Sequence, residues 1–76
     1  MQIQDLKVGH TVRIIAIKAG DKTYRQRLLA MGLVPGTQLT VTRMAPLGDP
    51  IEIAVRGCAL SLRKNEAAIL QVEVVG

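Results

Sequence analysis

Residues 23–39, TYRQRLLAMGLVPGTQL, carry the signals of a helix, a helix stop, a turn and a strand, in that order. Thr23 and Gln26 have the spacing of a capping box, in which two side chains bond reciprocally to the first backbone N–H groups of a helix. The pattern predicts a helix over residues 24–31. At about 100° per residue, three of its side chains share one face and should pack against the rest of the protein: Tyr24, Leu28 and Met31.

The residues that follow predict where this helix ends. Gly32 stands where a left-handed residue commonly ends a helix, and Leu28 and Leu33 are then spaced for the hydrophobic contact of a Schellman motif. Pro35 followed by Gly36 is the order of a type II turn. The chain should therefore leave the helix at Gly32, turn, and enter a strand.

The remaining sequence predicts strands. Alternating or β-branched runs bounded by turn residues occur at residues 11–18, 37–44, 51–56, 58–63 and 68–75. A turn is expected at 19–22 and a single helical turn at 64–67. The third and fourth strands should form a hairpin in which Cys58, Leu60 and Leu62 point together into the core. We therefore predict an all-β fold, a five-stranded SH3-like barrel with one short helix inserted after the first strand, because closure protects the edges of so small a sheet.

The composition sets the class of protein. Its 76 residues leave room for one domain, residues 1–76, and the absence of Phe and Trp requires an aliphatic core. The apolar runs are too short for a spanning helix and no signal-peptide pattern opens the sequence, so we expect a soluble, cytoplasmic protein without direct membrane insertion. The single cysteine agrees with a reducing compartment. Ten Lys and Arg against six Asp and Glu give a net charge of +4, which favours acidic partners.

The residues suited to metal binding or catalysis are few and scattered. His10 is predicted in a surface turn and Cys58 in the core, and Asp49 with Glu52 would offer a cation only two carboxylates. A lasting transition-metal site needs three or four ligands. Ser61 should face solvent with no histidine near it in the sequence. We therefore expect no metal site, no cofactor and no enzymatic activity.

Nucleic-acid binding is a second interpretation, because small basic barrels often bind nucleic acid. Recognition of single strands on such barrels relies on aromatic side chains that stack on bases, and Tyr24 is the only aromatic residue. The basic residues are also spread along the chain. A protein partner is therefore favoured over nucleic acid, which stays an alternative.

The predicted helix offers one candidate protein-binding patch. Leu29 lies roughly 100° round the helix from Leu28, on the side of Arg25, while Arg27 flanks the opposite edge. Leu29 could simply sit on the rim of the fold, as exposed leucines often do. Alternatively it supplies apolar area to a docking patch in which Arg25 and Arg27 supply charge, since arginine is enriched at interfaces and pairs with carboxylates in bidentate fashion.

Residues 46–50, PLGDP, form a second candidate surface. Two prolines stiffen this loop, so Leu47 would be held outward at low entropic cost, beside the charged Asp49. The alternative is a plain rigid turn with Leu47 folded back on the core.

Three stretches resemble a known family: RLLAMGLVPGTQLTV at 27–41, APLGDPIEIAVRG at 45–57 and LSLRKNEAAIL at 60–70. They are similar to the ferrous iron transport protein A (FeoA) family, and the similarity runs through essentially the whole chain. The resemblance implies an SH3-like barrel and a non-enzymatic adaptor in the cytoplasm. This adaptor would be required for ferrous iron uptake and would bind and modulate the cytoplasmic part of the FeoB permease.

The same resemblance leaves other roles open. FeoC and a second copy of the chain are further candidate partners. The barrel is also similar to the C-terminal domain of metal-responsive DtxR-type repressors, which keeps a regulatory role as an alternative. A third role is activation of the GTP-binding domain of the permease, in which Arg25 or Arg27 would offer a guanidinium to a phosphate.

Overall fold

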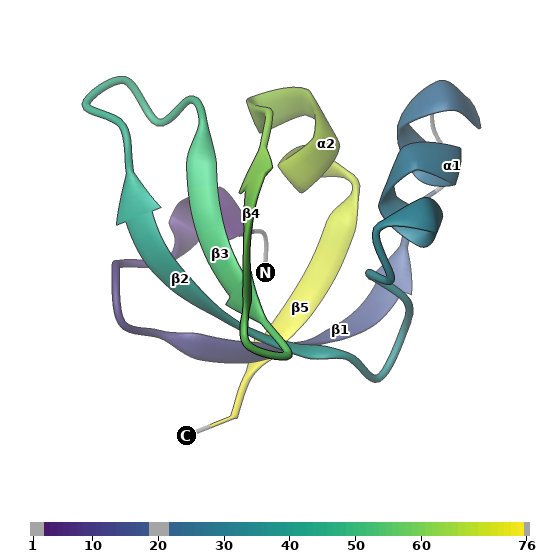
Figure 1. The fold of residues 1–76 in the computed structure, drawn as a ribbon, viewed down its shortest axis with the longest axis horizontal. Helices are drawn as coiled ribbons and strands as arrows, with labels where there is room; N and C mark the ends of the chain where they lie inside the picture. Colours follow the sequence, from purple (N-terminus) through teal and green to yellow (C-terminus); the bar gives the residue numbers. More distant parts are fainter. Residues whose placement is uncertain (1–2, 19–21, 76) are drawn as a thin grey trace.

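The computed structural model describes residues 3–18 and 22–75. In chain order its elements are a 3-10 helix η1 (Ile3–Asp5), β1 (Thr11–Ile17), α1 (Lys22–Ala30), β2 (Gln38–Met44), β3 (Ile51–Val55), β4 (Cys58–Leu62), α2 (Lys64–Ala68) and β5 (Leu70–Val74). Within these residues five antiparallel strands form one curled sheet in the order β4-β3-β2-β1-β5, with α1 inserted after β1 (Figure 1). The predicted mainly-β, SH3-like barrel is confirmed. Three of the residues in the turn predicted at 19–22, residues 19–21, lie outside the described part of the chain.

The end of α1 follows the predicted Schellman motif. Gly32 has a φ of 83°, the left-handed conformation that glycine adopts without a steric penalty. The Leu33 N–H donates to the Leu28 carbonyl at 3.0 Å, and the Gly32 N–H donates to the Leu29 carbonyl at 3.0 Å. Leu28 and Leu33 are both fully buried, so this stop also contributes to the core.

The start of α1 differs from the prediction. The helix already includes Lys22, so Thr23 lies in its first turn and is not the N-cap residue of a capping box. Past the helix, the type II turn is confirmed: the Thr37 N–H donates to the Val34 carbonyl at 3.1 Å, and Gly36 has a φ of 95°.

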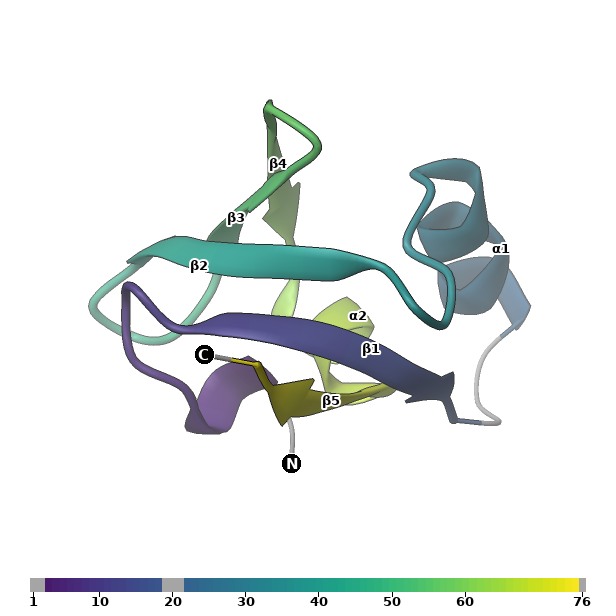
Figure 2. The same cartoon turned by 90° about the horizontal axis from the view of Figure 1, so that it is seen from below.

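The hairpin of β3 and β4 is confirmed, but the predicted burial of Cys58 is wrong. Arg56 and Gly57 form a two-residue connection with φ values of 52° and 79°, as in a type I′ turn. Cys58 pairs with Val55 beside this turn and is exposed, whereas Leu62 at the other end of β4 is fully buried. Cys58 shares a face with Leu62, but the turn projects away from β1 and β2, beyond the core (Figure 2).

The core is aliphatic, as the composition requires. Alternation on β2 and β3 is confirmed, since the inward residues Leu39, Val41, Ile51, Ile53 and Val55 are buried. Sequence reasoning missed one contribution: Ile3 and Leu6, around η1, are 0% and 5% exposed and belong to the same cluster. The N-terminal segment therefore closes part of the barrel. The whole buried apolar set is Ile3, Leu6, Val12, Ile14, Leu28, Leu33, Leu39, Val41, Ile51, Ile53, Val55, Leu62, Ala67, Leu70 and Val72.

Candidate partner-binding surface

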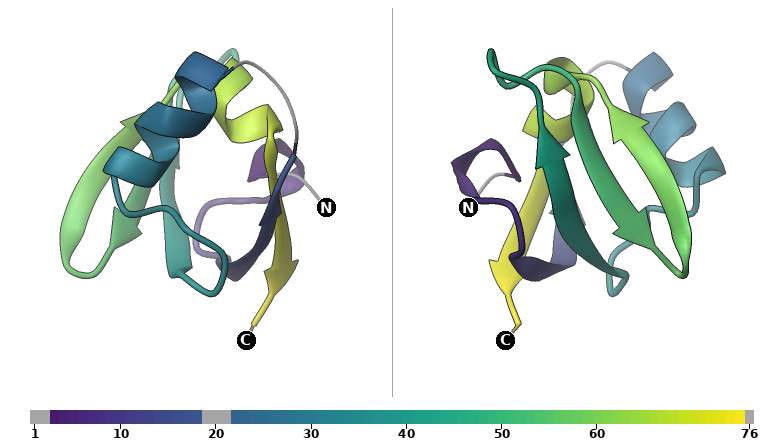
Figure 3. Two further views of the ribbon diagram at one scale, coloured as in Figure 1. Left: turned by 90° about the vertical axis from the view of Figure 1, so that its right-hand side faces the viewer. Right: turned by 60° about the vertical axis from the view of Figure 1, so that its left-hand side comes forward.

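Both candidate patches lie at one end of the barrel. In Figures 1 and 3, α1, α2 and the loop over residues 45–50 gather at the top, while β5 ends at the bottom. The short helix α2 contacts both of the other elements. Its first N–H, from Lys64, donates to Asp49 Oδ1 of the loop at 3.2 Å, and its Glu66 pairs with Arg27 of α1. The three elements are therefore joined through α2.

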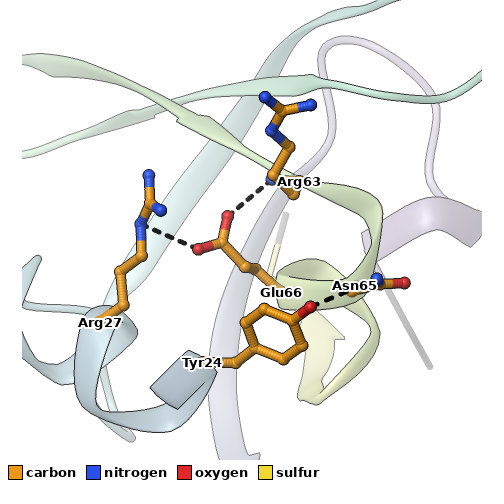
Figure 4. A network of polar contacts seen from close by, with 5 residues as sticks. All are labelled: Tyr24, Arg27, Arg63, Asn65 and Glu66. Carbon is orange, nitrogen blue, oxygen red and sulfur yellow. Dashed lines mark hydrogen bonds and ion pairs between the residues drawn. The ribbon is translucent and has the colours of Figure 1, made fainter. Parts of the chain in front are cut away.

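Glu66 is the polar centre of this junction (Figure 4). It is 1% exposed, and its Oε1 accepts the Arg63 N–H at 2.8 Å, which is one half of a capping box at the start of α2. Arg63 cannot complete the box, because an arginine side chain has no acceptor. Arg27 Nε lies 2.9 Å from Glu66 Oε2, an oxygen without a hydrogen-bond partner among the described residues. This ion pair thus supplies the countercharge for a buried carboxylate.

A second contact links the same two helices. Asn65 Nδ2 of α2 lies 3.5 Å from the hydroxyl oxygen of Tyr24 on α1 (Figure 4). Tyr24 and Met31 are partly buried and Leu28 is fully buried, so the helix face predicted to pack inward does so. The position of α1 on the barrel is fixed by this apolar face and by the polar contacts to α2.

Of the outward-facing residues of α1, Arg27 makes an ion pair, whereas Leu29 and Arg25 are described by their exposure. Leu29 is 42% exposed and Arg25 is exposed, as the helical geometry predicts. The side chain of Arg27 is 62% exposed but is anchored by Glu66 through its Nε, which the sequence pattern did not indicate. The guanidinium of Arg27 is therefore tied to Glu66 at its Nε and open to solvent elsewhere.

The loop presents Leu47 to solvent. This side chain is 90% exposed, so the alternative in which it folds back on the core is wrong. The loop is braced by the Gly48 N–H donating to the Ala45 carbonyl at 2.8 Å, and the Ala45 N–H donating to the Pro50 carbonyl at 3.2 Å. Asp49 contributes its bond to α2. The exposed Leu47 side chain is thus carried by a loop that is braced by hydrogen bonds.

Two hollows border the loop in the described structure. One, here called the arginine hollow, is lined by Arg27, Pro50, Ser61, Leu62 and Arg63. It joins α1, the loop and β4, segments that are far apart in the sequence. The other lies at the base of the loop and is lined by Arg43, Met44, Ala45, Pro46, Pro50 and Glu52. Sequence reasoning missed Arg63 and Glu66. The one local signal was Glu66 at the third position of the helical turn, where a Glu can accept the N–H of the residue before the helix.

Residues 1–74 match the family described as FeoA domain. This chain belongs to the FeoA family. A relative from Porphyromonas gingivalis, the "Fe(2+) transport protein A/Fe(2+) transporter FeoB fusion protein", is 35% identical over 75 residues, which cover 99% of this chain and 9% of the relative. The solution structure of the FeoA protein from Chlorobium tepidum has a TM-score of 0.88 and 39% identity, covering 100% of this chain and 71% of that one.

The FeoA family is associated with ferrous iron transport, and in the P. gingivalis relative the domain is fused to the transporter itself. FeoA domains are transport accessory domains and are not a known class of enzyme. The same barrel occurs in a manganese-dependent transcriptional repressor solved with manganese, with a TM-score of 0.91 over 99% of this chain and 36% of the repressor chain. At 18% identity, that similarity shows the fold alone.

The residues of this FeoA domain suited to metal binding lie apart. His10 is exposed and its Nδ1 accepts the Lys7 N–H at 3.1 Å, while Cys58 stands at the turn of the β3–β4 hairpin. Over residues 3–18 and 22–75, no three His, Cys, Asp or Glu side chains are grouped so that they could hold a metal ion. None of the helices that the structure describes has the length and apolar content needed to traverse a bilayer.

Proposed function

We propose that this FeoA domain is a non-enzymatic accessory protein that binds the cytoplasmic part of the FeoB transporter and so supports ferrous iron uptake. The observation that carries the proposal is the fusion of a 35% identical domain to FeoB in one polypeptide. Fusion keeps two domains at high effective concentration, which is useful to domains that act on one another. The proposal places the present domain in the cytoplasm, where that part of the transporter lies.

The docking site in this proposal is the helical-end surface, defined by the exposed side chains of Arg25, Arg27, Leu29, Leu47 and Asp49. Leu47 and Leu29 supply the apolar area that a partner would cover, with exposed fractions of 90% and 42%. Arg25 and Arg27 supply charge beside it. Because the loop and α1 are both anchored on α2, binding would order few new torsions, and such preorganisation favours affinity.

The first test is the affinity of the purified domain for the cytoplasmic part of FeoB, measured by calorimetric titration. Leu29→Asp and Leu47→Asp place a charge where apolar contact is expected, and each should weaken binding by about tenfold or more, a loss of about 1.4 kcal/mol. Both side chains are exposed, so the fold should persist. Val8→Asp is the matched control, because Val8 is 58% exposed in the turn between η1 and β1, away from the helical end.

Cells that depend on this transport system for ferrous iron give the second readout. Uptake should fall with Leu29→Asp or Leu47→Asp and be normal with Val8→Asp. Equal binding by all four proteins would remove the helical-end surface from the proposal. A wild-type domain that does not bind FeoB at micromolar concentrations would remove FeoB as the partner.

Stimulation of GTP hydrolysis is the other candidate role at this surface. An arginine that assists hydrolysis must reach the phosphates in the transition state. Arg27 is 62% exposed, which leaves its guanidinium accessible, although its Nε faces Glu66. Faster GTP turnover by the FeoB domain in the presence of this protein, lost with Arg27→Ala, would establish the role. Unchanged turnover at saturating protein would end it. Binding to FeoC and self-association stay predictions.

A further inference from the structure

The arginine hollow shares only Arg27 with the helical-end surface, so most of its lining has no role in the proposed function. Arg27 reaches it from α1, Pro50 from the loop, and Ser61, Leu62 and Arg63 from β4 and the start of α2. Leu62 is fully buried, so the lining is apolar at that point, and Ser61 and the two arginines are exposed at the rim. A small polar group entering here would meet hydrogen-bond donors above an apolar patch.

Each arginine has donors to spare. Arg27 contacts Glu66 through Nε, which leaves its two terminal nitrogens outside that contact. Arg63 contributes its backbone N–H to Glu66, while its guanidinium makes no ion pair within residues 3–18 and 22–75. Arginine presents five N–H donors in a planar fork, so both side chains can bond further groups.

The charged residues around the hollow indicate which kind of group it would bind. The charged residues that line it are Arg27 and Arg63, and both are basic. Two acidic residues lie beside it: Glu66, which is 1% exposed and lies between Arg27 and Arg63 in Figure 4, and Asp49, which precedes Pro50 and accepts the Lys64 N–H. Arg27 and Arg63 therefore offer positive charge and free N–H donors to one further carboxylate. A phosphate dianion would bring twice the charge of a carboxylate close to Glu66 and Asp49 and would be repelled more strongly. A planar carboxylate also fits the bidentate geometry of arginine.

We propose that the arginine hollow receives an Asp or Glu side chain from the partner protein, held by Arg27 and Arg63 with Ser61 as a further donor. The inference rests on the proposed function in taking that partner to be the cytoplasmic part of FeoB. It assigns a binding role to Arg63 and Ser61, and it adds an acidic anchor to the apolar contacts of Leu29 and Leu47.

The first experiment titrates the cytoplasmic part of FeoB into wild-type protein, Arg63→Gln and Arg56→Gln. Arg63→Gln leaves the backbone N–H that Glu66 accepts, so α2 should remain capped. Arg56→Gln is the matched control: it removes the same charge from an exposed arginine at the hairpin turn, whose guanidinium lies beside Gly32 after α1 and which does not line the hollow. A hydrogen bond to a charged group contributes enough that Arg63→Gln should weaken binding about tenfold or more, and the control less than twofold.

The second experiment tests the hollow without FeoB. An acetylated tetraglutamate peptide, and separately inorganic phosphate, is titrated into the wild-type domain while backbone amide NMR shifts are recorded. The peptide should shift the amides of Ser61 and Arg63 at millimolar concentration, the shifts should vanish in Arg63→Gln, and phosphate should cause smaller shifts.

The outcomes separate the two proposals. If FeoB binds and the two arginine variants bind equally, the carboxylate site is refuted while the proposed function stands. If FeoB does not bind but the peptide shifts the hollow, the partner is wrong and the site stands. A peptide that leaves Ser61 and Arg63 unshifted, or phosphate that binds as well as the peptide, overturns the assignment of a carboxylate.

Discussion

Replacing Arg27 with glutamine removes the countercharge that the described structure gives to the buried Glu66. Removing one partner of a fully buried ion pair costs about 3–5 kcal/mol, whereas a fully exposed pair contributes about 1 kcal/mol or less. Here the Glu66 side chain is 1% exposed and the Arg27 side chain is 62% exposed. The expected loss therefore lies between these limits, at about 2 kcal/mol, because Glu66 would stay in place with only its bond from the Arg63 N–H.

Thermal unfolding measures this loss directly. For a domain of this size, about 1 kcal/mol corresponds to a change of about 4–8 °C in Tm, so Arg27→Gln should lower Tm by about 8–16 °C. The matched control is Arg25→Gln, an exposed arginine on the same helix, which should change the free energy of unfolding by no more than about 0.5 kcal/mol.

A double-mutant cycle with Glu66→Gln identifies the source of the effect. Once Glu66 is neutral, Arg27→Gln should cost much less than in the wild-type background, and the coupling energy should be about 1 kcal/mol or more. If Arg27→Gln and Arg25→Gln unfold at the same temperature, or if the cycle shows no coupling, Arg27 is not the stabilising partner of Glu66.

Other predictions follow from the backbone, the N-terminal segment and the hairpin. Gly32→Ala should lower stability by about 1–2 kcal/mol in urea unfolding, because φ is 83° there. An added Cβ would lie 3.7 Å from Arg56 Nη1, an ordinary contact, so the cost is conformational, and an unchanged midpoint would contradict it. Ile3→Ala should cost about 2–5 kcal/mol in the same assay, since Ile3 is 0% exposed; a loss below about 0.5 kcal/mol would show that η1 is not part of the core. Cys58 should react with an aromatic disulfide reagent in the native state at a rate close to that in urea, whereas slow native reaction would restore the buried interpretation.

The parts of the fold that the sequence predicted are those set by neighbouring residues. The stop of α1 depends on Gly32 and on apolar residues within six positions, and these act locally in any context. The same holds for the Pro35–Gly36 turn and for the alternation of Leu39 and Val41 on β2. The outward position of Leu29 followed from helical geometry alone.

The parts that it did not predict depend on residues far apart in the chain. Alternation placed Cys58 on the correct face of β4, but exposure depends on how far the hairpin extends past the core, which the pairing pattern does not contain. The burial of Ile3 likewise depends on the distant α2 and β5. Arg27 and Glu66 are 39 positions apart, so their pairing required the placement of both helices.

The position of β5 constrains how a partner can be tethered to this domain. Figures 1 and 3 show β5 ending at the face opposite α1, α2 and the 45–50 loop. The fold measures 28 × 26 × 23 Å along its principal axes. A polypeptide joined after β5 would need roughly eight extended residues, at about 3.3 Å each, to run the height of the barrel before it could place a partner on Leu47 or Leu29. Engineered fusions with linkers shorter than this should hold a partner near the domain while keeping it off the helical-end surface.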